Sequence, residues 1–200
     1  MIRRHLVLFV REPRLGMGKR RLARDVGDAA ALRFERAMLG LLARRLGRDR
    51  RWRLRLAVTP QRARQRARLW PPGVAVASQG GGDLGQRMRR ALAACPPDPA
   101  VLVGTDIPAL GAHHIADAFR QLGRHDVVFG PAGDGGFWLV GARRCPCLPP
   151  LFGRVRWSGP HALADVLDNL PRRFRVGFAA GLEDVDDGAA YRCRAPRRGF

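Results

Sequence analysis

Near its beginning the chain reads LVLFVREPRLGMGK (residues 6–19), in which an apolar run is followed by a loop that carries two glycines and ends in a lysine. The apolar residues Leu6–Val10 have the length of a buried strand. Lys19 is the single lysine among the 37 lysines and arginines of the chain. Lysine brings a compact charge to a flexible polyphosphate, whereas arginine offers a rigid planar fork. We therefore interpret Lys19 as a candidate phosphate ligand; the alternative is that one lysine remains there by chance.

Short apolar runs recur along the chain and alternate with amphipathic stretches, a pattern typical of strands joined by crossover helices. The expected strands are Leu6–Val10, Leu54–Val58, Val74–Ala77, Val101–Gly104, Val127–Gly130, Phe137–Val140 and Phe174–Phe178. Between the first two, residues 28–46 place apolar side chains on one helical face. A second helix is expected after the N-cap residue Asp83, and a last long helix over residues 159–170, with Pro160 in its first turn. The sequence thus predicts an α/β fold with a parallel or mixed sheet.

The size and composition indicate one globular domain. The chain has 200 residues, of which 46% are hydrophobic, and this is enough for a single core. We place the domain at residues 1–191 and interpret residues 192–200 as a loosely held basic tail. The apolar stretch at residues 6–10 is too short for a signal-peptide core or a membrane span. We therefore expect a cytoplasmic protein that has no membrane partner.

The net charge of +20 would, by itself, suggest a nucleic acid or an anionic membrane as partner. The arginines, however, are spread through nearly every segment from Arg3 to Arg198 rather than clustered. No recognised nucleic-acid module or pattern of stacking aromatic residues accompanies them. We therefore do not expect nucleic acid to be the main partner. Nothing in the sequence indicates the oligomeric state.

Open α/β sheets bind their ligands at the carboxyl ends of the strands, so the residues just after each apolar run are the candidates for chemistry. The fourth run is followed by Gly104-Thr105-Asp106-Ile107-Pro108. A carboxylate held at the end of a buried strand is a hard oxygen ligand, which Mg²⁺ or Mn²⁺ requires when it bridges phosphate oxygens. The alternative is that Asp106 caps the helix expected near Ala112.

The fifth run is followed by GPAGDGGFWLVG (residues 130–141), which surrounds Asp134 with glycines. Glycine lets backbone amides approach a ligand closely, and this loop would bring Asp134 to the same edge of the sheet as Asp106. Asp-Gly between two apolar runs is equally a hairpin signal, so a tight turn is the alternative.

Two other segments contain candidate binding residues. The glycine loop Gln79–Gly82 enters the helix that Asp83 opens, and a helix N-terminus favours a phosphate or the ribose and base of a nucleotide. This loop matches neither the dinucleotide fingerprint nor the Walker loop. LEDVDD (residues 182–187) concentrates four acids in a basic chain. Asp186 is the candidate for a second metal ligand there, and a solvated acidic face is the alternative.

Taken together, these segments resemble a bacterial family of small, mostly uncharacterised GT-A-like transferases. Its members are described as glycosyltransferases or as radical-SAM/selenodomain-associated transferases. The resemblance covers nearly all of the chain up to about Tyr191. It rests on residues 11–22, Gly82–Met88, Thr105–Pro108, the GPAGDGG motif with its aromatic pair, Phe152, Trp157-Ser158 and Leu182–Asp186. The family is similar to the molybdenum-cofactor and 2-phospholactate guanylyltransferases, which share the nucleotide-binding sheet and an aspartate at the position of Asp106.

The resemblance implies a GT-A-like three-layer sandwich with a mostly parallel central sheet. It also implies that Lys19 holds nucleotide phosphates, that Asp106 holds the Mg²⁺ or Mn²⁺ ion, and that Asp134 faces the second substrate. Family members usually carry a threonine where this chain has Arg20. The candidate site residues are Asp134 and Lys19 for catalysis; Arg14, Gly16, Lys19, Arg21, Gly82 and Asp83 for the nucleotide; Gly135, Gly136, Trp157 and Ser158 for the acceptor; and Asp106 and Asp186 for the metal.

The expected activity is a metal-dependent transfer of a sugar from a nucleoside diphosphate sugar to a small acceptor. An alternative is a nucleotidyltransferase that joins a nucleoside triphosphate to a phosphorylated acceptor and releases pyrophosphate. Thr105-Asp106-Ile107 favours this alternative, because it lacks the second acid of the D-x-D motif common in sugar transferases. A catalytically idle nucleotide-binding domain is the third hypothesis.

Overall fold

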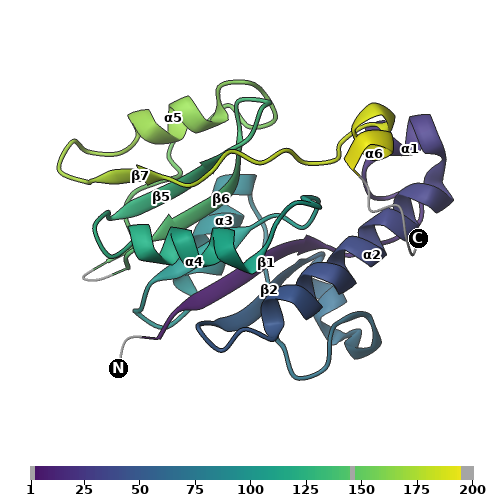
Figure 1. The fold of residues 1–200 in the computed structure, drawn as a ribbon, viewed down its shortest axis with the longest axis horizontal. Coiled ribbons are helices and arrows are strands. Elements are labelled where there is room, and N and C mark those ends of the chain that lie inside the picture. Colours follow the sequence, from purple (N-terminus) through teal and green to yellow (C-terminus); the bar gives the residue numbers. More distant parts are fainter. Residues whose placement is uncertain (1–2, 145–146, 195–200) are drawn as a thin grey trace.

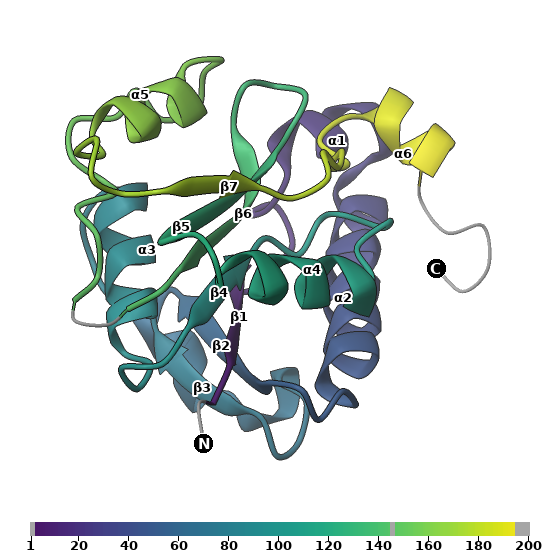
Figure 2. The same ribbon diagram turned by 60° about the vertical axis from the view of Figure 1, so that its left-hand side comes forward.

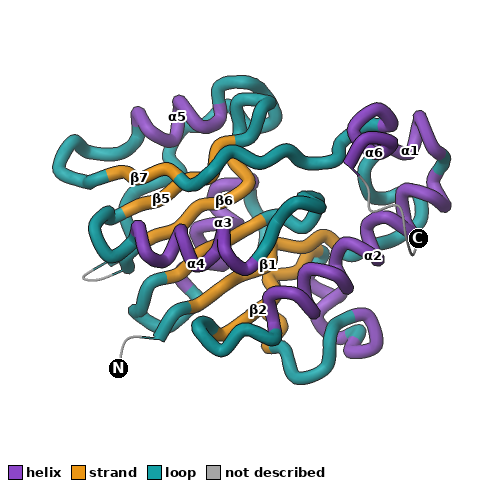
Figure 3. The backbone as a smooth tube through the Cα atoms, viewed as in Figure 1, coloured by secondary structure: helices purple, strands orange, loops and turns teal. Residues whose placement is uncertain are grey.

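The computed structural model describes residues 3–144 and 147–194, in which strands and helices alternate along the chain (Figures 1 and 3). The strands are β1 (His5–Arg11), β2 (Arg53–Thr59), β3 (Ala75–Ser78), β4 (Ala100–Val103), β5 (Val127–Pro131), β6 (Phe137–Ala142) and β7 (Val176–Phe178). The α-helices are α1 (Arg20–Val26), α2 (Asp28–Gly47), α3 (Leu84–Ala93), α4 (Ala112–Gln121), α5 (Ala162–Asp168) and α6 (Gly188–Arg194). Two short 3₁₀-helices, η1 (Gln61–Gln65) and η2 (Ala67–Leu69), follow β2.

The strands form a seven-stranded sheet in the order β3-β2-β1-β4-β6-β5-β7. β1 pairs in parallel with β2 on one side and with β4 on the other. Among the described strands, β6 alone runs antiparallel to its neighbours. The strand order therefore changes direction between the central strands β1 and β4. Their carboxyl ends lie side by side at the same end of the sheet. Lys19 follows the first of these strands, and Asp106 follows the second.

Helices cover both faces of the sheet and complete three layers (Figure 2). Leu6 of β1 lies in one core cluster with Phe34 of α2 and Ile115 of α4. The next residue, Val7, points to the opposite face and packs in a second cluster that includes Met88 of α3 and residues of α5. This alternation places α2 and α4 on one face and α3 and α5 on the other.

The predicted α/β fold with a mostly parallel sheet is confirmed. Each expected strand forms, and its ends differ from the expected ends by no more than two residues. The expected N-cap at Asp83 is also confirmed, because its carboxylate accepts a hydrogen bond of 2.7 Å from the amide of Gln86. The Gln86 side chain in turn accepts from the Asp83 amide, which completes a capping box.

The prediction of a long helix over residues 159–170 is wrong. α5 spans only Ala162–Asp168 with His161 as its N-cap, so Pro160 lies before the helix rather than in its first turn. Tertiary contacts hold this segment in a turn against the β5–β6 hairpin. Gly135 leaves no room for a Cβ atom beside the Pro160 carbonyl, and the amide of Leu163 donates to the Gly135 carbonyl at 3.1 Å.

The last described helix, α6, enters the segment interpreted from the sequence as a tail. It extends through Tyr191 to Arg194, and the Tyr191 ring lies edge-on to Phe34 of α2 with ring centroids 5.6 Å apart. Residues 192–194 thus belong to a helix, whereas residues 195–200 lie outside the described residues. The domain boundary at residue 191 stays a prediction.

Candidate active site

A cleft of about 980 Å³ opens at the carboxyl ends of the strands, where β1 and β4 lie side by side. Residues from both sequence halves line it, which is the position where open α/β sheets bind ligands. Eight of the sequence-predicted site residues are among its lining residues: Lys19, Arg21, Asp106, Asp134, Gly136, Trp157, Ser158 and Asp186.

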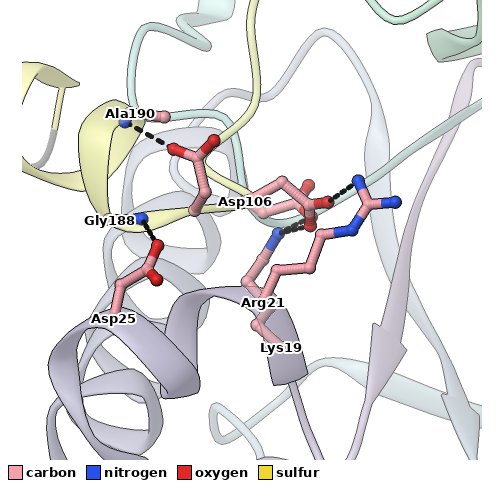
Figure 4. A network of polar contacts seen from close by, with 8 residues as sticks. Lys19, Arg21, Asp25, Asp106, Gly188 and Ala190 are labelled. Atoms are coloured by element: carbon pink, nitrogen blue, oxygen red, sulfur yellow. Dashed lines mark hydrogen bonds and ion pairs between the residues drawn. The ribbon is translucent and has the colours of Figure 1, made fainter.

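Lys19 is the centre of an ion-pair cluster in this cleft (Figure 4). Its Nζ atom lies 2.7 Å from Oδ2 of Asp106 and 3.2 Å from Oδ1 of Asp186. Arg21, the second residue of α1, contacts the other oxygen of Asp186 at 3.4 Å. The fold thus joins the loop after β1, the loop after β4 and the acidic segment near the C-terminus, which the sequence analysis treated as separate candidates.

The Lys19 side chain is only 11% exposed, so its charge is largely removed from water. Burial by itself would lower the pKa of this ammonium, but the carboxylates of Asp106, Asp186 and Asp184 outweigh burial and raise the pKa. Lys19 is therefore a fixed positive charge at neutral pH. Its carboxylate partner Asp106 does not cap α4, because Gly111 is the N-cap residue of that helix.

Two further acids belong to this site and were not singled out from the sequence. Burial, together with the charges of Asp106 and Asp186, raises the pKa of Asp184 to about 6. Burial also raises the pKa of Glu35 on α2, although the amide and charge of Lys19 oppose that shift. Asp184 was passed over because its side-chain direction depends on how the acidic segment docks. Glu35 lies within a helix, where an acid carries no sequence signal of its own.

Hydrogen bonds on both sides of Asp186 hold the acidic segment in the cleft, and Figure 4 shows those that follow it. The Val185 amide donates to the Asp106 carbonyl at 3.0 Å, which fixes the segment against the loop after β4. After it, the Asp187 carboxylate accepts from the Ala190 amide at 2.8 Å within the first turn of α6. The Asp25 carboxylate of α1 accepts from the Gly188 amide at 2.7 Å. Asp186 is thus positioned from two sides.

Asp134 lies in the turn of the β5–β6 hairpin, as the Asp-Gly signal indicated, and it also lines the cleft, so its role in binding stays a prediction. Its Oδ1 atom accepts from the Gly136 amide at 2.9 Å, which fixes the carboxylate orientation. Gly135 adopts a φ of 82° and packs against Pro160 at the back of the turn rather than lining the cleft. The carboxylate of Asp134 is exposed and available to a ligand.

Trp157 and Ser158 form the wall of the cleft next to α3. The indole of Trp157 packs on Gly85 and lies near the rings of Phe152 and Phe137. Ser158 adopts a φ of 65°, a strained conformation for a residue with a side chain. Such conformations persist where surrounding packing enforces them, often at binding sites.

The remaining sequence-predicted nucleotide residues lie beside the cleft and not among its lining residues. Arg14 and Gly16 line a small neighbouring cavity behind the loop, together with Lys19. Gly82 and Asp83 lie at the N-terminus of α3, where the Asp83 carboxylate is engaged by the capping box. The following residue, Leu84, does line the cleft.

Gln79 and Arg87 also line the cleft; the sequence analysis named the segments that contain them but assigned neither side chain a role. Gln79 is fully buried, and its Nε2 atom donates to the carbonyls of Val10 and Ala57 at 3.0 and 2.7 Å. Because the amide nitrogen is committed to β1 and β2, its oxygen faces Arg87 and accepts from that guanidinium. The guanidinium also lies over the Phe9 ring, 5.5 Å from its centroid. In the sequence, a glutamine beside glycines indicates only a loop residue, so nothing there predicts that Gln79 positions Arg87.

The residues present fit a divalent cation that is bound together with a phosphate group. In the described part of the chain, no group of three or more His, Cys, Asp or Glu side chains is gathered closely enough to hold a metal ion by itself. Mg²⁺ in nucleotide sites is, however, commonly held by one or two carboxylates plus phosphate oxygens and water. Asp106 and Asp186 both reach the Lys19 ammonium, so both can reach one cation. Burial and the negative charges of Asp106 and Asp186 raise the pKa of Asp184, and a divalent cation would offset those charges.

Comparison with protein families assigns the chain. Residues 42–159 match the model of a family described as "Uncharacterized protein conserved in bacteria (DUF2064)", and the chain belongs to this family. No curated protein sequence matches the chain. None of the helices within the described residues has the length and apolar character needed to cross a membrane.

Solved structures share the fold over most of the chain. A protein from Desulfovibrio desulfuricans G20, provisionally described as a nucleotide-diphospho-sugar transferase, is 28% identical with a TM-score of 0.86, covering 99% of this chain and 90% of that one. Glucosyl-3-phosphoglycerate synthase from Mycobacterium tuberculosis, in complex with Mn²⁺, UDP and glucosyl-3-phosphoglycerate, is 14% identical with a TM-score of 0.53, covering 92% and 71%. A cytidylyltransferase from Leptospira borgpetersenii is 16% identical with a TM-score of 0.53, covering 89% and 76%. These structural neighbours are transferases, and the last two show the fold alone.

Proposed function

We propose that this member of the DUF2064 family is a transferase that uses a nucleotide-activated donor, specifically a nucleoside diphosphate sugar, and glycosylates a small acceptor with the help of Mg²⁺ or Mn²⁺. One observation carries the proposal: Lys19, Asp106 and Asp186 meet at the switch point between β1 and β4, inside a cleft large enough for a nucleotide. A permanently charged ammonium next to carboxylates that can hold a metal ion stabilises the negative charge of a departing diphosphate. The similarity to the Desulfovibrio protein supports the same class of donor.

In this proposal, Asp106 and Asp186 would hold the ion, which supplies positive charge to the diphosphate. Lys19 adds a second positive charge to the same group and stabilises it as the glycosidic carbon–oxygen bond breaks and the electron pair moves to the phosphate oxygen. Asp134, on the hairpin turn, would accept the proton of the acceptor hydroxyl while the hydroxyl oxygen bonds to the sugar carbon. Catalysis is thus mainly electrostatic.

The other predicted residues keep binding roles within the proposal. Arg21 would contact the donor phosphates from α1, and Arg14 and Gly16 would shape the loop that precedes Lys19. Gly82 and Asp83 would present the first-turn amides of α3 to the nucleotide. The acceptor would lie between the Gly135-Gly136 turn and the wall made by Trp157 and Ser158.

A nucleotidyltransferase is the second candidate, and one observation favours it. Thr105-Asp106-Ile107 offers one acid after β4, and the second carboxylate comes from the distant residue Asp186. In that reaction an acceptor phosphate oxygen would attack the α-phosphorus of a nucleoside triphosphate, and pyrophosphate would leave. The same ammonium and carboxylates could serve this departure.

Product analysis separates these candidates. The protein is incubated with Mn²⁺ and either nucleoside diphosphate sugars or nucleoside triphosphates. Release of a nucleoside diphosphate from the former supports glycosyl transfer or its hydrolytic side reaction, whereas pyrophosphate release from the latter supports nucleotidyl transfer. Lys19→Ala and Asp106→Ala should abolish either activity. Folded variants that keep full turnover would show that these two side chains are not needed, whereas a wild type that binds nucleotide but forms neither product would support a catalytically idle domain.

A thermal-shift screen of nucleotides, with and without Mn²⁺, identifies the base. A ligand that binds only the folded protein raises the melting temperature by mass action. We expect the largest increase when a nucleotide and the metal are present together. No stabilisation by any nucleotide would contradict the proposed function.

A further inference from the structure

The carboxylates proposed to hold the metal are already occupied by a cation of the chain itself. The Lys19 ammonium lies 2.7 Å from Asp106 and 3.2 Å from Asp186, so it sits where the two carboxylates converge. It is also the buried member of the cluster, at 11% exposure compared with 32% for Asp106 and 50% for Asp186. The ammonium therefore blocks the approach that a second cation would need.

A divalent cation and the Lys19 ammonium cannot both occupy the position between the Asp106 and Asp186 carboxylates. Mg²⁺ takes oxygen ligands at about 2.0–2.1 Å, and a positive charge held against the same oxygens repels it. The ammonium therefore has to leave before both carboxylates can bind a metal. It needs another anionic partner when it leaves, because an unpaired buried charge is costly.

The two anionic segments are less free to move than the lysine. The Val185 amide binds the Asp106 carbonyl, and the acidic segment continues into α6, which contacts α1 through Asp25 and Gly188. Lys19, in contrast, carries its charge on a flexible four-carbon stem with rotatable bonds. Rotation about those bonds can turn the ammonium toward the cleft without moving the backbone.

We infer that Lys19 acts as a placeholder cation between Asp106 and Asp186, and that the ligand of this site is the chelate of a divalent metal with a nucleoside diphosphate rather than the metal alone. The diphosphate draws the ammonium away from the carboxylates and provides its new partner, which vacates the metal position. Metal and diphosphate consequently bind with positive coupling. The inference rests on the proposed function, since it takes Asp106 and Asp186 as the metal ligands.

The charges of the cluster support this role. Lys19 neutralises part of the repulsion among Asp106, Asp186 and Asp184, which is also why the pKa of the ammonium is raised. Replacing Lys19 with a neutral residue leaves these carboxylates without that counter-ion. The variant should therefore attract a metal ion more strongly than the wild type, although it loses a phosphate ligand.

The test measures Mn²⁺ binding directly, through the free Mn²⁺ signal in electron paramagnetic resonance, without nucleotide. Lys19→Met is expected to bind Mn²⁺ alone about tenfold more tightly than the wild type, a coupling of ordinary size. Lys19→Gln should behave in the same way and serves if the methionine variant does not fold. Arg20→Met is the matched control, because it removes the same charge from the neighbouring residue; its Mn²⁺ affinity should stay within about twofold of the wild type.

A second arm uses UDP as the probe with the wild-type protein. Mn²⁺ and UDP together should raise the melting temperature by more than the sum of their separate effects, and this excess should be absent in Lys19→Met. Equal Mn²⁺ affinity in the wild type and both Lys19 variants, with the wild type still stabilised by Mn²⁺ and a nucleotide, would overturn the inference and leave the proposed function standing. Failure of the wild type to bind any nucleotide, with or without Mn²⁺, would overturn both.

Discussion

The Lys19 ammonium and the Asp106 carboxylate are 2.7 Å apart and connect the loops that follow two adjacent parallel strands, β1 and β4. Parallel pairing places both strand ends at one edge of the sheet, and the change of strand order between them leaves a crevice there. The contact therefore follows from topology and not from proximity in the sequence. It locates the proposed chemistry at one point of the fold.

Asp106→Asn should weaken metal-dependent nucleotide binding by at least about tenfold, because an amide is a poor ligand for a hard cation. The stability cost should be about 1 kcal/mol or less, since Lys19 keeps Asp186 as a partner and the pair is partly exposed. Nucleotide titration in the presence of Mn²⁺, together with urea unfolding, measures both effects. Unchanged binding would remove Asp106 from the metal site.

Asp25→Ala removes the acceptor of the Gly188 amide, so the segment that carries Asp186 should become less firmly held. We expect a loss of about 1 kcal/mol in the free energy of unfolding, because Asp187 and Tyr191 still fix α6. Binding of Mn²⁺ with UDP should weaken, which calorimetry can measure.

Asp49→Ala is the control for this variant. Its carboxylate likewise accepts a hydrogen bond from a backbone amide, that of Arg51, but it lies beyond the C-terminal end of α2. Its binding of Mn²⁺ with UDP should equal that of the wild type. Equal binding by Asp25→Ala as well would show that α6 does not position Asp186.

Gly85→Ala should disturb the acceptor wall. The added Cβ atom would lie 2.6 Å from a ring carbon of Trp157 and 2.8 Å from the Cβ of Phe152, so the indole has to move. Overpacking of this kind costs about 1–3 kcal/mol. Acceptor affinity should fall, and steady-state kinetics should show a higher KM for the acceptor.

Gly81→Ala provides the comparison for this prediction, because a Cβ atom there meets nothing within 4 Å. It should leave both stability and acceptor KM close to wild-type values. If Gly85→Ala matched Gly81→Ala in both measurements, Trp157 would have no role in the acceptor site.

His5 should make stability depend on pH. Burial and the charge of Arg55 lower the pKa of this side chain, although Asp98 opposes them, and the residue is 1% exposed. The unfolded chain therefore binds a proton near the ordinary histidine pKa of about 6.5 while the folded protein does not. The free energy of unfolding is highest above that pH and falls as the pH drops below it, by at most about 1.4 kcal/mol per pH unit.

His5→Leu removes this titration. Urea unfolding between pH 7.5 and 5.5 should show a shallower loss of stability in the variant than in the wild type. Parallel pH profiles would mean that His5 does not contribute. The measurement is independent of the cleft, because His5 lies at the opposite end of β1 from Lys19.

The sequence by itself determined the fold class and the edge of the sheet where chemistry should lie. Apolar runs alternating with amphipathic stretches specify strands and covering helices through local burial, and that information is contained in each segment. Lys19 and Asp106 could be singled out because each directly follows such a run. The helix expected over residues 159–170 failed because Gly135 and Pro160, distant in sequence, pack against each other.

The tertiary structure alone decided which side chains meet. The docking of the loops and α6 on the sheet brings Asp184, Asp186 and Glu35 close to Lys19. It also allows Arg87 to donate a hydrogen bond to Gln79. No pattern within a segment records that docking, because a side chain's direction at a loop is set by contacts with residues far away in the chain. Periodicity encodes which face of an element is buried, whereas only packing brings separate charges within ion-pair distance.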